Sequence, residues 1–140
     1  MNNALTSACL LAELGYRVFP CVPGEKRPAN QHGVTDATND IEAIDNWWKL
    51  HPGANIGVST DGLLVVDVDP VFGGPNPWLN DHQERLATAC GAYSISPRGG
   101  LHFWFRQPEG ANYRNTAGKI APAVDTRANG GYVLVAPSRT

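Results

Sequence analysis

In its last third the chain passes repeatedly from a short β-rich run to a glycine-rich turn. This alternation predicts strands over residues 92–96, 101–107, 124–127 and 131–136. Glycine and proline are frequent along the whole chain, with 15 and 11 of its 140 residues, so loops and short strands should outnumber long helices. The pattern therefore disfavours an all-helical bundle.

The first part of the chain begins with a predicted helix over residues 4–14, which Gly15 is placed to end. Its apolar face is predicted to consist of Leu10, Leu11 and Leu14. A strand over residues 16–22 and a long polar loop should follow.

Two more helices are predicted further along the chain. Asn39 and Glu42 resemble a capping box that begins the second helix, and His51 precedes the Pro-Gly pair that ends it. The third helix is predicted over residues 78–90, where helix-forming residues precede a glycine.

Between these helices lie two β-rich runs, residues 55–59 and 63–69, separated by an Asp-Gly pair. Because Asp-Gly is a common hairpin signal, we predict that the two runs pair antiparallel. The elements together predict an α+β fold in which a mostly antiparallel sheet packs with about three helices. The length and apolar content suit one globular domain over residues 1–140.

Charge and cysteine content narrow the function classes. With 11 Lys and Arg against 13 Asp and Glu, the net charge is -2, so nucleic-acid binding would depend on a local basic patch. Cys9, Cys21 and Cys90 lie in or beside apolar runs, which indicates reduced core thiols rather than a zinc site. No apolar run approaches the roughly 20 residues of a membrane span, so we expect a soluble cytoplasmic protein with no membrane partner.

The strongest local signal is the run LLVVDVD, in which Asp67 and Asp69 follow four apolar residues. On a strand, residues two apart share a face, so both carboxylates should point the same way. Such a pair of hard oxygen ligands suits magnesium or manganese. The alternative interpretation is two solvated acids at the end of a strand.

A second signal is SPRGGLHFWF, in which a Gly-Gly turn precedes a strand that carries His102. Alternation places Leu101, Phe103 and Phe105 on one face and His102 with Trp104 on the other, so His102 need not lie in the core. A glycine turn with an arginine and an imidazole can form a phosphate cradle. The alternative interpretation is a structural histidine.

The third signal is Asp125, which follows an apolar pair and precedes a Gly-Gly turn and a predicted buried strand. Asp125 could complete a three-carboxylate metal site, and Arg127 should lie on the same face two residues later. On its own, Asp125 could equally be a solvated acid.

The order of these signals resembles the bifunctional primase-polymerase (Prim-Pol) amino-terminal domain of the archaeo-eukaryotic primase superfamily, found in viral, plasmid and mobile-element replication proteins. That superfamily has an hhhDhD/E motif, an s-x-H motif and an h-D motif, where h is apolar and s is small. The matching residues here are Asp67, Asp69, His102 and Asp125. Flanking K-x-P, A-T-x-D, W-W and N-I-G segments are similar too, at residues 26–28, 37–40, 47–48 and 55–58.

The resemblance implies an RRM-like catalytic core that joins NTPs or dNTPs to a 3′-hydroxyl, or starts a primer, with two Mg²⁺ or Mn²⁺ ions. By motif position, Asp67, Asp69 and Asp125 would hold the ions. The residues expected to bind nucleotide or template phosphates are His102, Arg98, Gly99, Gly100, Arg127, Lys26 and Arg27.

The resemblance also implies a single-stranded DNA template and a primer as partners, and a helicase region downstream or in trans. A phage or plasmid protein of this kind would work in the cytoplasm of its host cell. The family usually continues beyond A-P-S with a G-x-x-Y-x-W segment, so we expect this chain to be cut short at the carboxy-terminal end of the family domain.

Two other functions remain open from the sequence. A metal-dependent phosphodiesterase or nuclease would use the same carboxylates and histidine but would release nucleotides. A non-catalytic nucleotide- or DNA-binding module would keep metal-dependent nucleotide binding without extending a primer.

Overall fold

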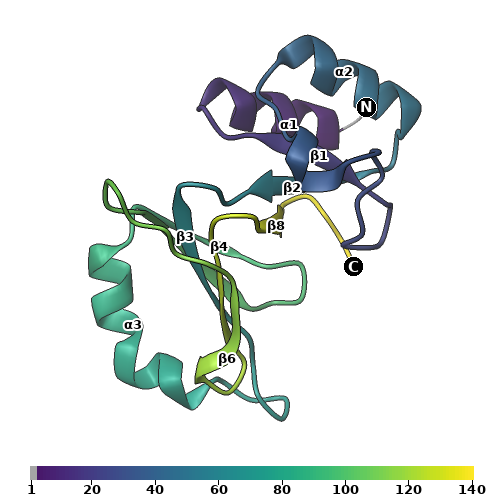
Figure 1. Ribbon diagram of the computed structural model, residues 1–140. Coiled ribbons are helices and arrows are strands. Elements are labelled where there is room, and N and C mark those ends of the chain that lie inside the picture. The colour runs from purple at the N-terminus through teal and green to yellow at the C-terminus, as the bar shows by residue number, and fades with distance from the viewer. Residues whose placement is uncertain (1–2) are drawn as a thin grey trace. The chain divides into compact units, whose positions relative to one another are not determined.

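The computed structural model describes residues 3–140, which form three α-helices, one 3₁₀ helix and eight strands (Figure 1). In chain order they are α1 (Asn3–Glu13), β1 (Val18–Cys21), η1 (Gly33–Asp36), α2 (Ile41–Leu50), β2 (Asn55–Ser59), β3 (Leu63–Val68), α3 (Pro77–Ala89), β4 (Ala92–Ile95), β5 (Leu101–Arg106), β6 (Thr116–Ala121), β7 (Val124–Arg127) and β8 (Tyr132–Val135). All paired strands in the described part run antiparallel. The predicted α+β fold class is confirmed.

The chain divides into two compact units, and the first runs to Ser59 and resumes at Tyr132. Its sheet has the order β1-β2-β8, and α1 and α2 pack with one another and with β1. The Phe19 ring lies over Gly57, its partner on β2, where an added Cβ would come within 2.6 Å of the ring. Every residue of β1 and β2 is buried, so these two strands form part of the core of the first unit.

The second unit, residues 60–131, contains a five-stranded sheet with the order β4-β5-β3-β7-β6. One face of this sheet packs under α3 (Figure 1). The buried residues of that face are Val66, Val68, Phe103 and Val124, and α3 contributes Trp78, Leu79 and Leu86. The alternation predicted for the strand with Phe103 is confirmed, because Leu101 and Phe105 join the same cluster.

The predicted hairpin between residues 55–59 and 63–69 is wrong, because β2 and β3 belong to different sheets. The turn that joins them pairs instead with residues far along the chain. The Thr60 amide donates to the Gly131 carbonyl at 2.9 Å, and the Gly130 amide donates to the Asp61 carboxylate at 2.6 Å. Asp61 and Gly62 do form a turn, but hydrogen bonds to Gly130 and Gly131, rather than pairing between β2 and β3, determine its arrangement.

Two helix details also differ from the predictions. The N-cap of α2 is Asp40, not Asn39, and its carboxylate accepts from the Glu42 amide at 3.2 Å. In α1 the buried residues are Ala8 and Ala12, whereas two of the three predicted leucines are largely exposed. Small alanines let neighbouring elements approach closely, which the apolar pattern alone did not indicate.

The three cysteines differ in burial. Cys21 is buried in the core, and burial raises the pKa of its thiol to about 12, so it stays protonated and inert. Cys9 and Cys90 are free but only half-buried.

Strand β6 was not predicted, because its sequence TAGKIA has few strand formers and it lies exposed at a sheet edge. No helix in the described part is long and apolar enough to cross a membrane.

Candidate functional site

The face of the five-stranded sheet opposite α3 carries a row of polar residues. Asp67 on β3 lies directly opposite His102 on β5 and Asp125 on β7. Ser94 on β4 extends the row as the partner of His102. Directly opposite residues of antiparallel strands present their side chains to one face, with Cβ atoms about 5 Å apart. The sheet register therefore gathers two carboxylates and an imidazole that are far apart along the chain.

Asp67 and His102 form the buried centre of this row. His102 Nε2 lies 3.3 Å from Asp67 Oδ1, and the two side chains are only 5% and 14% exposed. Among the described residues, Asp67 Oδ1 and His102 Nδ1 are two of the few buried side-chain atoms with no hydrogen-bond partner. Asp67 Oδ1 has the 3.3 Å ion-pair contact with His102, whereas His102 Nδ1 has no such contact and is suited to bind a ligand, since buried polar atoms are nearly always paired.

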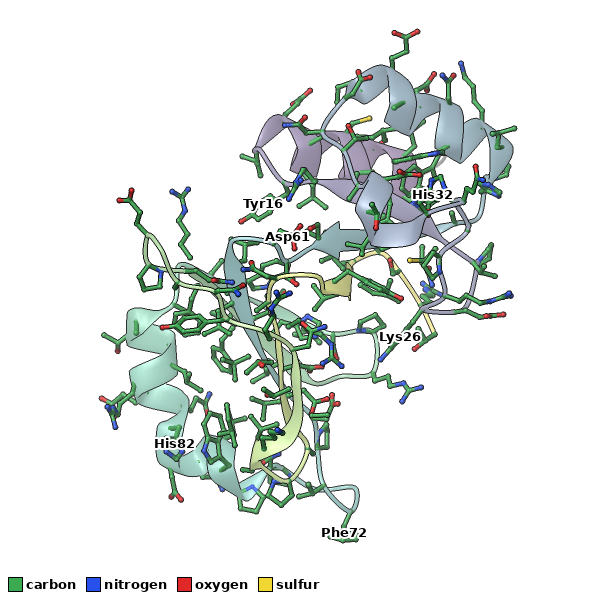
Figure 2. The ribbon with its side chains drawn as sticks, viewed as in Figure 1. Tyr16, Lys26, His32, Asp61, Phe72 and His82 are labelled. Carbon is green, nitrogen blue, oxygen red and sulfur yellow. The ribbon has the colours of Figure 1, made fainter. Side chains whose placement is uncertain are left out.

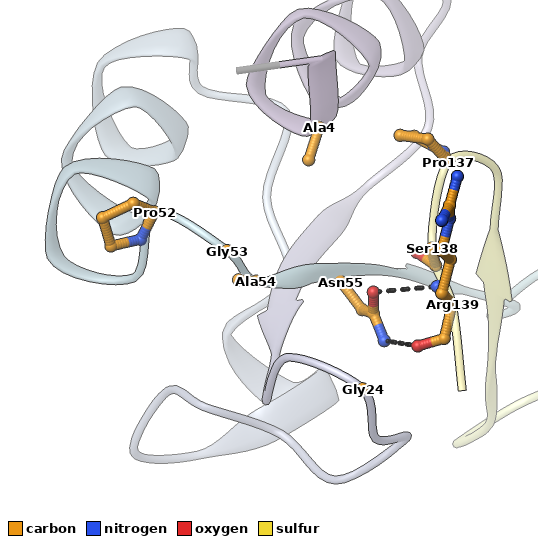
Figure 3. Close-up of a pocket in the computed structure, with 9 residues that line it drawn as sticks. All are labelled: Ala4, Gly24, Pro52, Gly53, Ala54, Asn55, Pro137, Ser138 and Arg139. Carbon is orange, nitrogen blue, oxygen red and sulfur yellow. Dashed lines mark hydrogen bonds between the residues drawn. The ribbon is translucent and has the colours of Figure 1, made fainter. Parts of the chain in front are cut away.

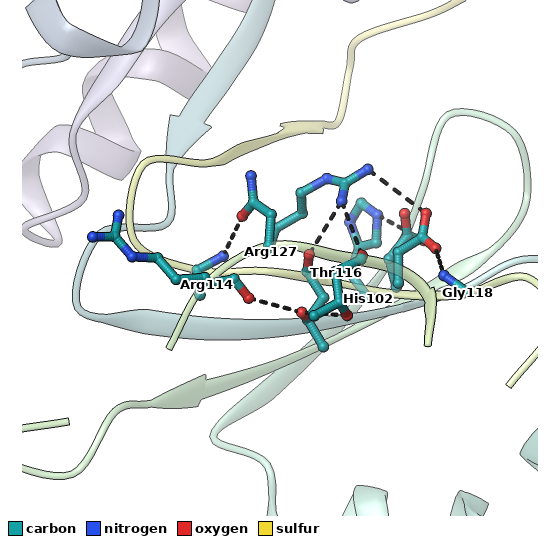
Figure 4. A network of polar contacts seen from close by, with 10 residues as sticks. His102, Arg114, Thr116, Gly118 and Arg127 are labelled. Carbon is teal, nitrogen blue, oxygen red and sulfur yellow. Dashed lines mark hydrogen bonds and ion pairs between the residues drawn. The ribbon is translucent and has the colours of Figure 1, made fainter. Parts of the chain in front are cut away.

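Asp125 is held by neighbours on β6 and β7 (Figure 4). The Gly118 amide donates to Asp125 Oδ1 at 2.8 Å, and Arg127 Nη2 lies 3.6 Å from Asp125 Oδ2. Arg127 also donates to the Thr126 carbonyl at 3.1 Å, which fixes the guanidinium. Arg127 thus shares the face of Asp125, as the sequence predicted.

Asp69 and Gly100 lie beside the row, just past the end of β3. The Asp69 amide donates to the Ala123 carbonyl at 2.9 Å, which continues the pairing of β3 with β7. A Cβ on Gly100 would come within 2.5 Å of Asp69 Oδ1 and 2.8 Å of the Val68 carbonyl oxygen. Only glycine fits at position 100, so the backbone of this turn approaches the second carboxylate closely.

The turn between β4 and β5 is organised by Ser96. Its carbonyl accepts from the Gly99 amide at 2.9 Å, and its hydroxyl accepts from the Gly100 amide at 2.9 Å. Gly99 has a φ of 84°, in the left-handed region that glycine favours. Arg98 lies exposed in this turn.

The predicted site residues therefore divide into two groups. Eight lie in the second unit, on the polar face or in the segments that adjoin it: Asp67, Asp69, Arg98, Gly99, Gly100, His102, Asp125 and Arg127. Lys26 and Arg27 lie in the first unit, on the loop after β1, and their role at phosphates stays a prediction. His102 is on the predicted face but is buried, with 4% exposure.

Two contacts of this face were missed from the sequence. Ser94 and Gly118 touch the row only because of sheet register, and the register between β6 and β7 shifts between Thr116 and Ala121. An irregularity of this kind depends on long-range pairing and leaves no local signal.

The donor set suits a hard divalent cation. Carboxylate oxygens are the ligands that Mg²⁺ prefers, and Asp67 offers a buried one, Oδ1, which lies 3.3 Å from His102 Nε2. Within residues 3–140, however, no group of three or more His, Cys, Asp or Glu side chains lies close enough to hold a metal ion. Asp125 instead faces Gly118 and Arg127, so a three-carboxylate site would require its side chain to turn.

These features define an α+β protein with acidic residues and a histidine on one face of an antiparallel sheet. The chain belongs to the family of bifunctional DNA primase/polymerase amino-terminal (Prim-Pol) domains, whose model it matches over residues 8–140. This match confirms the family resemblance seen in the sequence and supports primase or polymerase activity as the general function. A comparison with curated proteins finds no match.

Proposed function

We propose that this chain is the nucleotidyl-transfer core of a DNA primase/polymerase, which adds NTPs or dNTPs to a primer on a single-stranded DNA template. The observation that carries the proposal is the row of Asp67, His102 and Asp125 on one sheet face. Membership of the Prim-Pol family supports the same class of reaction.

In this proposal, Asp67, Asp69 and Asp125 hold two Mg²⁺ or Mn²⁺ ions. When bound, such ions activate the 3′-hydroxyl and neutralise charge on the triphosphate and the leaving pyrophosphate. The chain's own contribution is to fix the carboxylates. Sheet pairing fixes Asp67 and Asp125, and the close approach of Gly100 confines Asp69.

His102 is proposed to bind phosphate. Its Nε2 faces Asp67 at 3.3 Å, while its buried Nδ1 has no hydrogen-bond partner among the described residues. An imidazole held by a carboxylate keeps a fixed orientation, so it can present its other nitrogen to a phosphate oxygen. Burial strengthens such a contact because little water competes for it.

Charge on the triphosphate is proposed to be shared among Arg98, Arg127 and the amides of Gly99 and Gly100. Arg127 lies on the same face as Asp125, and its side chain is 31% exposed. In the turn that carries Arg98, a Cβ added to Gly99 would meet nothing within 4 Å, so a phosphate has space to approach the backbone there. Arginine and backbone amides are the groups that suit phosphate oxygens.

The same family membership supports proposing a phage or plasmid replication protein, with a helicase region downstream or in trans, that works in the cytoplasm of the host cell.

The test is primer extension by the purified chain with a primed single-stranded template, Mn²⁺ and labelled dNTPs or NTPs. We expect template-directed products longer than the primer, and none when EDTA removes the metal. Shortening of an end-labelled primer in a parallel reaction would identify a nuclease instead. Metal-dependent nucleotide binding without extension, in this chain and in a longer one, would identify a binding module.

A further inference from the structure

Hydrogen bonds fix the backbone of the loop after β1, which carries Lys26 and Arg27. The carbonyl groups of three consecutive residues, Glu25, Lys26 and Arg27, each accept a hydrogen bond. The donors are the Asn55 side-chain amide at 3.0 Å, the Tyr132 hydroxyl at 2.8 Å and the Val22 backbone amide at 2.7 Å. The side chains of Lys26 and Arg27 remain exposed, and Lys26 extends from the loop (Figure 2).

Asn55 links this loop to a second basic segment. Its Nδ2 also donates to the Arg139 carbonyl at 2.8 Å, and its Oδ1 accepts from the Arg139 amide at 3.1 Å (Figure 3). Asn55 is 6% exposed, so these bonds are shielded from water. One buried side chain therefore positions Arg139 and the Lys26 loop together, within the first unit.

A cavity of about 230 Å³ adjoins this arrangement (Figure 3). Its walls include Gly24, Gly53, Asn55 and Ser138, and Arg139 is its charged lining residue. The Ser138 hydroxyl accepts from the Ile56 amide at 2.8 Å, so its own proton can be donated to a ligand. Pockets for whole small ligands measure roughly 300–1,000 Å³, so this cavity suits a phosphate group with part of a sugar.

We propose that Lys26, Arg27 and Arg139, here called the basic rim, bind the phosphodiester backbone of single-stranded DNA. This inference rests on the proposed function, to which it adds a location for the nucleic acid. With a net charge of -2, DNA binding would depend on a local group of basic residues, and these three lie on two segments that Asn55 joins. Arg27 pairs with Glu25 at 3.2 Å, but both side chains are exposed, so phosphate can replace that weak pair.

The experiment measures binding of a fluorescein-labelled single-stranded oligonucleotide by anisotropy, in EDTA and without nucleotide, at several salt concentrations. The double variant Lys26→Gln with Arg139→Gln should bind about tenfold more weakly at low salt. Losing two phosphate contacts should also reduce the slope of log K against log salt by about 1.4. The matched control is Lys49→Gln with Arg85→Gln, which removes the same charges from exposed sites elsewhere and should bind like wild type.

Asn55→Ala tests the role of the buried amide. It should weaken DNA binding while all three basic residues are kept, and circular dichroism will show whether the fold is retained. If that variant unfolds, the exposed double variant still decides the matter. Unchanged affinity and salt slope in the double variant would overturn the proposal, as would a raised dNTP KM with unchanged DNA affinity, which would assign the basic rim to the triphosphate.

Because this assay contains neither metal nor nucleotide, its outcome is separate from that of primer extension. DNA binding that depends on the basic rim in a protein that never extends primers would reject the nucleotidyl-transfer proposal alone. Extension by a protein whose DNA binding ignores the basic rim would reject the basic rim alone.

Discussion

The two faces of the five-stranded sheet come from the same strands but differ in every property that matters for function. Toward α3, Phe103 and Val66 are almost fully buried in an apolar cluster. Toward the opposite side, their chain neighbours His102 and Asp67 form a buried polar pair, in which His102 Nδ1 has no hydrogen-bond partner among the described residues. Because successive residues of a strand point to opposite faces, one residue stabilises the fold while its chain neighbour belongs to the candidate site. Substitutions on the apolar face should therefore lower stability more than activity, and substitutions on the polar face should lower activity more than stability.

The largest effect is expected from removing a carboxylate of the polar face. Asp67→Ala or Asp125→Ala should lower primer extension to about 10⁻⁴ of wild type or less, since bound metal contributes several kcal/mol to the transition state. Most of the protein should stay folded, because each substitution removes only a few polar contacts, each of which typically contributes about 1–3 kcal/mol. Primer extension and thermal unfolding of each variant measure the two expectations.

The matched control is Asp81→Ala, which removes an exposed acid from α3 and should leave extension unchanged. Wild-type extension rates in either Asp67→Ala or Asp125→Ala would refute the metal assignment.

The apolar face should show the reverse signature. Phe103 is 2% exposed, and Phe103→Ala should lower the free energy of unfolding by about 3–5 kcal/mol through lost burial and a cavity. Extension per folded molecule should stay near wild type, because Phe103 points away from the polar row. Urea unfolding, followed by activity measured on the folded fraction, tests this. A large activity loss in fully folded protein would break the division between the faces.

Alanine substitutions at the adjacent Gly99 and Gly100 should differ in their effect on primer extension. In Gly100→Ala the new Cβ would meet Asp69 Oδ1 and the Val68 carbonyl, so extension should fall about 100-fold as the second carboxylate is displaced, a cost of about 2.7 kcal/mol. Gly99→Ala meets nothing within 4 Å and should cost only about 1 kcal/mol of backbone strain at its φ of 84°. Equal activities of the two variants would contradict the close approach at Gly100.

The smallest effect on the reaction is expected at His102. His102→Ala should raise the nucleotide KM about tenfold, the low end for a hydrogen bond to a charged group, with a smaller change in kcat. Steady-state kinetics at fixed template concentration separate the two constants. An unchanged KM would mean that His102 has a structural role only.

The sequence predicted the parts of the site that depend on strand alternation. A period of two within one strand places His102 and Phe103 on different faces, as the structure has them, and it predicts a shared face for Asp67 and Asp69. The motif order then assigned Asp67, His102 and Asp125 to one site, and the pairing of β3 with β5 and β7 brings the three residues together.

The remaining features depend on contacts between distant residues, which a local pattern does not contain. The Asp61-Gly62 turn does not form a hairpin because its groups bond to residues 129–131. The Gly118 contact with Asp125 requires a shift of register between β6 and β7. Asp40 replaces Asn39 as the helix cap because the helix begins one residue later than the capping pattern indicates.

The most direct test of the central claim is to locate Mn²⁺ by anomalous diffraction in crystals of the protein grown with Mn²⁺ and a nucleotide. We expect manganese bound by carboxylate oxygens of Asp67, Asp69 and Asp125, with the nucleotide phosphates beside His102. Manganese held elsewhere on the protein, with these three carboxylates contacting neither metal nor nucleotide, would contradict it.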